Sequence, residues 1–146
     1  MKTNCKKRIL SFAVACVLII TTGTFMVNAQ EITPRYNNVE STSSSAAVSS
    51  SGVITVTNNY TANSSVFTKA VITTCIEKRT LGLFWSKVDI GQTNDEWVVT
   101  SYNNSYLGSH SHQLTKTGTY RATVEYVFYG SGGSADNITK EVEVKY

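Results

Sequence analysis

Two histidines separated by one residue, His110 and His112, have the only metal-like spacing in this 146-residue chain. Residues i and i+2 of a strand point to the same side, so two such imidazoles could share an ion. A zinc site needs a third and usually a fourth ligand, and the sequence around this pair offers neither a cysteine nor a carboxylate. Because the pair follows Gly108 and Ser109, we expect a polar loop here and no bound metal.

The carboxylates do not form a pattern suited to acid–base catalysis, which needs one carboxyl group in an apolar pocket and one in water. Asp95 and Glu96 lie in a turn-like segment, and Glu141 and Glu143 share a strand face with Lys145. No Gly-x-Ser-x-Gly nucleophile motif is present. The glycine-rich turn at 130–134 opens no helix that could bind a phosphate. We therefore predict a non-enzymatic protein that uses no cofactor.

The aromatic residues in the middle of the chain are the candidates for ligand binding. Trp85 and Trp97 flank the middle of the domain, and Tyr102 and Tyr106 follow in an Asn- and Ser-rich stretch. Exposed Trp and Tyr beside Asn and Ser are typical of adaptable binding surfaces and of sugar-stacking platforms. Neighbours in a strand point to opposite faces, so either Phe84 or Trp85 should be exposed. The alternative is that both tryptophans belong to the core. The sequence leaves a binding face and a core position as two open interpretations.

The elements that must position these residues are short strands. Beyond residue 51 the chain is rich in Val, Ile, Thr and Tyr, which suit a half-buried strand. No window repeats apolar residues at helical spacing over two turns. The candidate strands cover residues 53–60, 69–79, 81–90, 96–102 and 119–129, and a last strand runs through Val142, Val144 and Tyr146.

Alternation along these strands predicts which side chains point inward. In the first strand the inward residues are Ile54, Val56 and Tyr60. In the second strand, inward-pointing Thr74 and Ile76 place Cys75 between them on the less buried face. In the long strand near the end of the chain, the inward set is Tyr120, Ala122, Val124, Tyr126 and Phe128.

Tyr120 makes the fold prediction more specific. It begins a long penultimate strand two residues after Gly118, which is typical of the tyrosine corner of immunoglobulin-like domains. Its hydroxyl group should then bind the backbone a few residues upstream. We predict an antiparallel immunoglobulin-like or fibronectin-type sandwich of about seven strands, without the cystine of true immunoglobulin domains.

The first 29 residues have the pattern of a secretory signal peptide. Four basic residues lie before residue 9, an apolar run follows over 9–20, and Val27 and Ala29 occupy the −3 and −1 positions of a cleavage site. A membrane anchor is disfavoured because the apolar run is short against the ~20 residues that a spanning helix needs. We therefore predict cleavage after Ala29 and secretion to the extracellular space.

Removal of the leader changes the charge and the thiol content of the chain. The leader contains four of the 13 Lys and Arg residues and none of the ten Asp and Glu residues, so a net charge of −1 remains. We therefore expect no basic field that could attract nucleic acid or anionic lipid. Cys5 and Cys16 are also removed, which leaves Cys75 as a free thiol and excludes an internal disulfide. Cys75 is then either a small strand residue or a thiol that is reactive or forms an intermolecular disulfide.

Residues 30–51 are expected to form a lead-in and residues 52–146 the β-sandwich domain. The lead-in contains Pro34 and a Ser/Thr tract at 41–45, which cannot bury enough apolar surface to fold alone.

Four short motifs are distributed along the mature chain. They are Ile32-Thr33-Pro34-Arg35-Tyr36, Ile76-Glu77-Lys78-Arg79, Gly118-Thr119-Tyr120-Arg121 and Asn137-Ile138-Thr139-Lys140. In these motifs the chain resembles a family of small secreted β-sandwich proteins of Gram-positive bacteria with no assigned activity. Thr74 departs from the family pattern, which has an apolar core residue there, and Cys75 stands where a large outward residue is expected.

These observations favour a secreted, non-enzymatic binding or adhesion module. Its partner would be an extracellular protein or glycan, with no stable membrane insertion after cleavage and a monomeric or weakly oligomeric state. An alternative is an antagonistic, toxin-like protein that acts on neighbouring cells. That activity would need exposed apolar surface or strong positive charge, and the net charge of −1 argues against the second.

Overall fold

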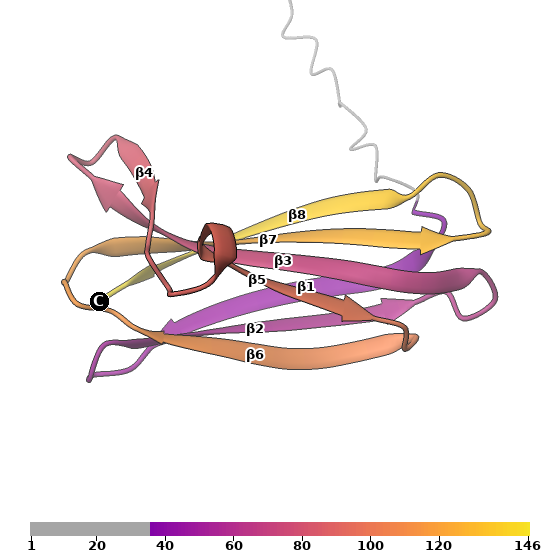
Figure 1. Ribbon diagram of the computed structural model, residues 1–146, viewed down its shortest axis with the longest axis horizontal. Helices are drawn as coiled ribbons and strands as arrows, with labels where there is room; N and C mark the ends of the chain where they lie inside the picture. Colours follow the sequence, from indigo (N-terminus) through magenta and orange to yellow (C-terminus); the bar gives the residue numbers. More distant parts are fainter. Residues whose placement is uncertain (1–35) are drawn as a thin grey trace, which may run out of the picture. The chain divides into compact units, whose positions relative to one another are not determined.

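The protein is an all-β structure of two antiparallel sheets packed against each other, seen here in a computed structural model that describes residues 36–146 (Figure 1). The predicted signal peptide, residues 1–29, lies outside the described residues. Within the described range no helix has the length and apolar character needed to cross a membrane. The eight strands of that range are β1 (Val39–Val48), β2 (Val53–Ala62), β3 (Phe67–Thr80), β4 (Phe84–Lys87), β5 (Glu96–Ser101), β6 (Ser105–Gln113), β7 (Thr119–Gly130) and β8 (Asp136–Lys145).

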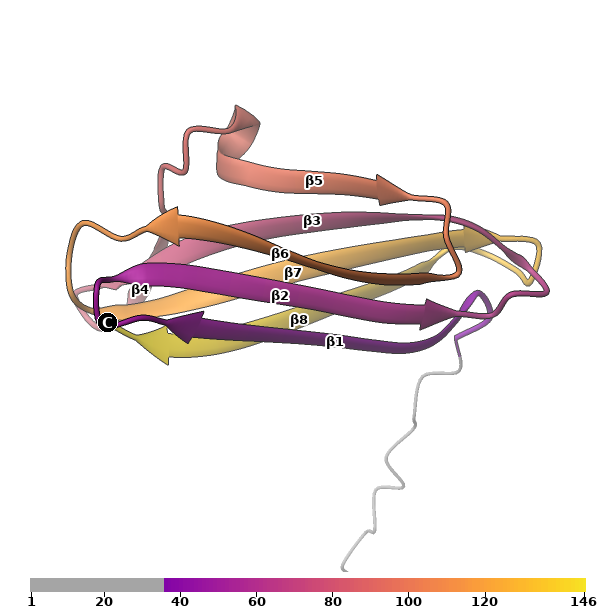
Figure 2. The same ribbon diagram turned by 90° about the horizontal axis from the view of Figure 1, so that it is seen from below.

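The two layers differ in the strands that form them (Figure 2). The smaller sheet has the order β1-β2-β6. In the larger sheet β3 pairs with β7, and β7 with β8. The other edge of β3 is shared by two short strands, because Ala70–Cys75 pairs with β5 and Glu77–Thr80 pairs with β4. The chain returns to the smaller sheet through the connection between β5 and β6 (Figure 2).

The core lies between the sheets and consists of the side chains that alternation predicted to point inward. Ile54, Val56 and Tyr60 of β2 are fully buried. Tyr60 packs edge-on against Phe128, with ring centroids 5.1 Å apart. The predicted face of β7 is confirmed, since its five residues, Tyr120, Ala122, Val124, Tyr126 and Phe128, are all buried.

The interpretation of residues 30–51 as a lead-in outside the fold is corrected for residues 39–48, which form β1. The strand pairs with β2 from Val39 to Val48. Backbone hydrogen bonds to β2 therefore hold β1 in the sheet, although its small side chains bury little apolar surface. Ser44 also points inward, and its hydroxyl lies 2.8 Å from that of Tyr126. A polar edge strand of this kind carries almost no apolar signal in the sequence.

Two other expectations about strands are corrected. The segment 110–112, expected as a polar loop, lies in β6, which pairs along nearly the whole of β2. The predicted strand 81–90 is reduced to β4, because Leu81 and Gly82 adopt positive φ angles of 53° and 71° and turn the chain. The turn expected before β5 is present and contains a short 3-10 helix at Thr93–Asp95.

The hydrogen bond expected of Tyr120 is present. Its hydroxyl donates to the carbonyl oxygen of Lys116, four residues upstream, and the side chain is 2% exposed. This contact connects the start of β7 to the β6–β7 connection. It therefore fixes the chain where it crosses between the sheets.

Tyr120→Phe is expected to lower the free energy of unfolding by about 1 kcal/mol, because the Lys116 carbonyl loses its donor without any change in apolar packing. Urea denaturation of residues 30–146 measures this change. Tyr129→Phe is the matched control, since that tyrosine is 39% exposed. Equal losses in both variants would show that the hydrogen bond has no stabilising role.

Candidate binding groove and hairpin tip

The four aromatic residues proposed as a ligand-binding face do not share one surface. Trp97 of β5 and Tyr106 of β6 are half-buried and pack against the core between the sheets. Trp97 stacks on His110 at 5.1 Å, and Tyr106 stacks on Tyr60 at 5.9 Å between ring centroids. Both rings are therefore used in packing.

The other two members lie elsewhere. Trp85 of β4 stands opposite Arg79 on the outer face of the larger sheet, and the guanidinium group of Arg121 lies 4.6 Å from its ring centroid. Tyr102 is 71% exposed in the turn between β5 and β6. Two of the four side chains thus lie between the two sheets, one lies on the outer face of the larger sheet and one lies in a turn.

The two histidines lie in a strand. His110 and His112 share the inward side of β6. Burial lowers the pKa of His110 below its ordinary value, so this imidazole is neutral at neutral pH. No group of three or more metal-ligating side chains occurs among residues 36–146.

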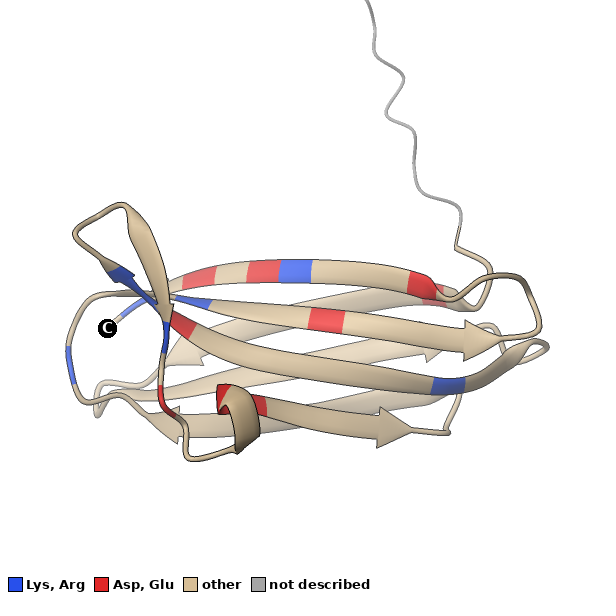
Figure 3. Cartoon of the chain, turned by 45° about the horizontal axis from the view of Figure 1, so that its top comes forward, with Lys and Arg blue, Asp and Glu red and all other residues tan. Residues whose placement is uncertain are grey.

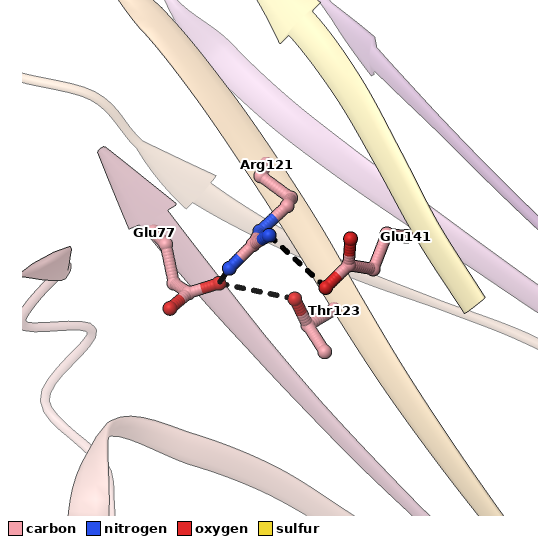
Figure 4. Close-up of polar contacts among 4 residues, drawn as sticks. All are labelled: Glu77, Arg121, Thr123 and Glu141. Atoms are coloured by element: carbon pink, nitrogen blue, oxygen red, sulfur yellow. Dashed lines mark hydrogen bonds and ion pairs between the residues drawn. The ribbon is translucent and has the colours of Figure 1, made fainter. Parts of the chain in front are cut away.

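A network of ion pairs crosses the outer face of the larger sheet (Figure 4). Arg121 of β7 donates two hydrogen bonds to one carboxylate oxygen of Glu77, at 2.9 and 2.7 Å, and lies 3.0 Å from Glu141. Thr123 donates to the same Glu77 oxygen at 3.1 Å. The guanidinium group therefore connects β3, β7 and β8, and its donors are used in that structural role.

Cys75 lies beside this network in a shallow hollow of about 230 Å³. Burial, and then the negative charge of Glu77, raise the pKa of the thiol above its ordinary value. Because the thiolate is the reactive form, a raised pKa makes Cys75 a weak nucleophile at neutral pH. This favours a packing role over a reactive one.

We expect iodoacetamide to alkylate Cys75 severalfold more slowly than free cysteine at pH 7. The rate should rise about tenfold per pH unit until the raised pKa is passed, because the thiolate fraction rises in that proportion. Lys87→Gln should slow the reaction further, since the charge of Lys87 opposes the upward shift in pKa. Alkylation as fast as that of free cysteine would contradict the assigned environment.

A basic groove of about 470 Å³ lies at the end of the sandwich where the β3–β4 hairpin meets the β6–β7 connection. Its lining contains three lysines, Lys78, Lys87 and Lys116, and a single carboxylate, Asp89. The rest of the polar lining consists of threonine, serine and tyrosine residues together with His112 and Gln113. Figure 3 shows basic segments of the hairpin, the adjacent loop and the C-terminal region at this end. Ammonium and hydroxyl donors together suit an anionic group.

The lysines of the groove differ in their freedom to bind a ligand. Lys87 is engaged by Glu96 in an exposed ion pair. Lys78 extends over the ring of Tyr120, 5.6 Å from the ring centroid. Among the described residues neither Lys78 nor Lys116 forms an ion pair. These two side chains are the available cations of the groove.

An apolar tip of the hairpin stands directly beside the groove. Leu81, Leu83 and Phe84 are 85%, 76% and 63% exposed, and the hairpin projects from the body of the molecule (Figure 1). The Nε of Arg79 donates to the carbonyl oxygen of Gly82 at 2.8 Å and holds the turn. The tip was not predicted from the sequence, because residues 81–90 were expected to form one continuous strand without a turn.

Comparisons with family models, curated proteins and solved structures find no match for this chain. The class of protein is accordingly defined by its own fold, an all-β sandwich-like structure of two antiparallel sheets with a basic groove and an apolar hairpin tip at one end.

Proposed function

We propose that this protein is a non-enzymatic binding module that acts outside the cell after removal of residues 1–29. We also propose an immunoglobulin-like or fibronectin-type sandwich, within the family of small secreted proteins of Gram-positive bacteria that the sequence resembles. The Tyr120–Lys116 hydrogen bond supports the fold assignment. The leader sequence supports export.

The ligand-binding surface of this module is the basic groove, and the ligand carries anionic groups. The observation that supports this assignment is the excess of three lysines over one carboxylate in a single concave lining. The carboxylates of Glu77 and Glu141 on the outer sheet face are instead used in ion pairs with Arg121. Recognition of an anion needs only the donors that the groove presents.

A binding array tests the proposal. Purified residues 30–146 should bind phosphorylated, sulfated or carboxylated molecules on a mixed array of glycans, proteins and lipids, and binding should weaken with salt. Lys78→Gln and Lys116→Gln should each reduce binding, whereas Lys69→Gln, on β3 away from the groove lining, should not. The absence of binding above background, or equal binding by all variants, would refute the proposed function.

The alternative, an antagonistic protein acting on neighbouring cells, is favoured by the exposed apolar tip. Dye leakage from vesicles and inhibition of bacterial growth distinguish the two functions. A binding module attaches to its ligand without causing leakage or growth inhibition.

A further inference from the structure

The hairpin tip presents apolar surface on a convex turn. Leu81, Leu83 and Phe84 occur within four consecutive residues and are each at least 63% exposed. The other large hydrophobic side chains with similar exposure are divided among β5, the β5–β6 turn and β6; they are Val98, Tyr102 and Leu107. A cluster of this kind marks a contact site.

The size and shape of the tip favour a bilayer over a protein partner. A stable protein interface buries roughly 800 Å² on each side, which a four-residue turn cannot supply alone. A bilayer interface needs no matching pocket, because lipid chains rearrange around an inserted apolar side chain. Trp85, which follows the tip directly, is of the residue type that prefers the membrane–water boundary.

The charges behind the tip match the headgroup layer of an anionic bilayer. Lys78 and Arg79 come just before the tip in β3, and Lys116 lies across the groove from the hairpin. Thr80 and Ser86 of the hairpin also line the groove, so the groove begins where the apolar tip ends. Each cation near an anionic membrane surface adds its own favourable contribution to the free energy of binding.

From this arrangement we infer that the hairpin end docks peripherally on an anionic phospholipid bilayer. The side chains of Leu81, Leu83 and Phe84 enter the interfacial layer, while Lys78 and Lys116 contact lipid phosphates at the groove. The inference rests on the proposed function, since it names the ligand class of the same groove. Docking of this kind requires no change in the sandwich core.

Vesicle co-sedimentation with residues 30–146 tests the inference. This segment omits the apolar leader and contains Arg35–Tyr146, a compact unit with its own core. We expect much stronger binding to vesicles containing phosphatidylglycerol than to pure phosphatidylcholine vesicles. The double variant L83S/F84S should bind at least about 10-fold more weakly. Lys78→Gln and Lys116→Gln should each weaken binding about 5-fold.

Matched controls separate docking from general effects on the protein. Leu107→Ser removes a side chain that is 72% exposed on β6, and Lys69→Gln removes a charge outside the groove; both should bind as the unsubstituted protein does. Thermal unfolding should be unchanged in every variant, because the substituted side chains lie outside the core.

The possible outcomes distinguish the inference from the proposed function. Equal binding to both vesicle types, or full binding by L83S/F84S, would overturn bilayer docking. If soluble anionic glycans or glycerol phosphate still bound in a lysine-dependent manner, the proposed function would stand and the ligand would be a soluble anion. Loss of all anion binding would refute both.

Discussion

Replacement of Asp136 by alanine is expected to lower the free energy of unfolding by about 3 kcal/mol and to release the start of β1. The Asp136 carboxylate accepts hydrogen bonds from the backbone N–H groups of Asn37, at 3.1 and 3.2 Å, and of Asn38, at 2.7 Å. Asp136 is only 7% exposed, so removal of its carboxylate leaves these donors without a partner in a largely dry site. Hydrogen bonds to a charged acceptor are among the stronger ones in proteins.

The side chain of Asn38 extends the same connection. Its amide nitrogen donates to the carbonyl oxygen of Ser134 at 3.0 Å, and its backbone carbonyl accepts from Asn63 at 3.1 Å. The entry to β1 is therefore attached both to the β7–β8 turn and to the β2–β3 turn. Because β1 has few buried apolar side chains, these polar contacts decide whether the strand stays docked.

Urea denaturation measures the loss of stability, and amide hydrogen exchange locates it. Exchange should accelerate across β1 in Asp136→Ala more than across β7. Glu143→Ala is the matched control, since it removes the same charge from an exposed position on the same strand and should change stability by less than about 0.5 kcal/mol. A similar small change in Asp136→Ala would show that the contacts at β1 do not stabilise the fold.

Thr74→Val is expected to destabilise the protein by about 2 kcal/mol, although valine has nearly the same shape as threonine. Thr74 is 1% exposed, and its hydroxyl accepts a hydrogen bond from the side-chain amide of Asn58 at 2.8 Å. The Oδ1 atom of Asn58 is buried and has no partner among the described residues. With valine at position 74, the amide group would be buried without any partner at either end.

The double variant N58L/T74V should recover most of that loss, because replacement of both polar partners removes the unsatisfied groups. A double-mutant cycle measured by chemical denaturation gives the coupling energy of the pair. Thr73→Val, on the outer face of the same strand, serves as the control and should be nearly neutral. Destabilisation of the double variant beyond that of Thr74→Val would contradict the proposed role of the pair.

The Asn58–Thr74 pair also gives the inward-pointing Thr74 a structural role. Its hydroxyl forms a contact between β2 and β3, which belong to different sheets. The sequence could indicate that Thr74 points inward but could not indicate its partner. Strand parity places Asn58 on the inward face with Val56 and Tyr60, but nothing in the sequence indicates that its amide group pairs with Thr74.

The strands predictable from the sequence are those whose own side chains form the core. Alternating apolar residues identify the inward faces of β2, β3 and β7, where parity alone assigns the buried positions. Two strands are held in place mainly by backbone hydrogen bonds to β2. These are the serine-rich β1 and β6, which contains glycine and histidine. Pairing of this kind depends on a partner strand and leaves almost no pattern in the paired segment itself.

The candidate site was less predictable for a related reason. Lys78 and Lys87 come from the two arms of the β3–β4 hairpin and Lys116 from the distant β6–β7 connection, and only the fold brings them to one groove. The aromatic residues are close in sequence, but strand parity separates them. Trp85 is paired with Arg79 and, like it, points to the outer face of the sheet. Trp97 is paired with Thr74 and, like it, points toward the core.

The position of the hairpin tip has a consequence for how sequences with this fold can diverge. Leu83 and Phe84 are exposed and belong to no part of the buried core. Substitutions at these two positions change what the molecule touches and leave the folding equilibrium almost unaffected. Leu81 and Gly82 have positive φ angles, so a side chain added at Gly82 would strain the turn that presents the tip. The contact chemistry of the tip can therefore change at Leu83 and Phe84 while the turn and the sandwich stay the same.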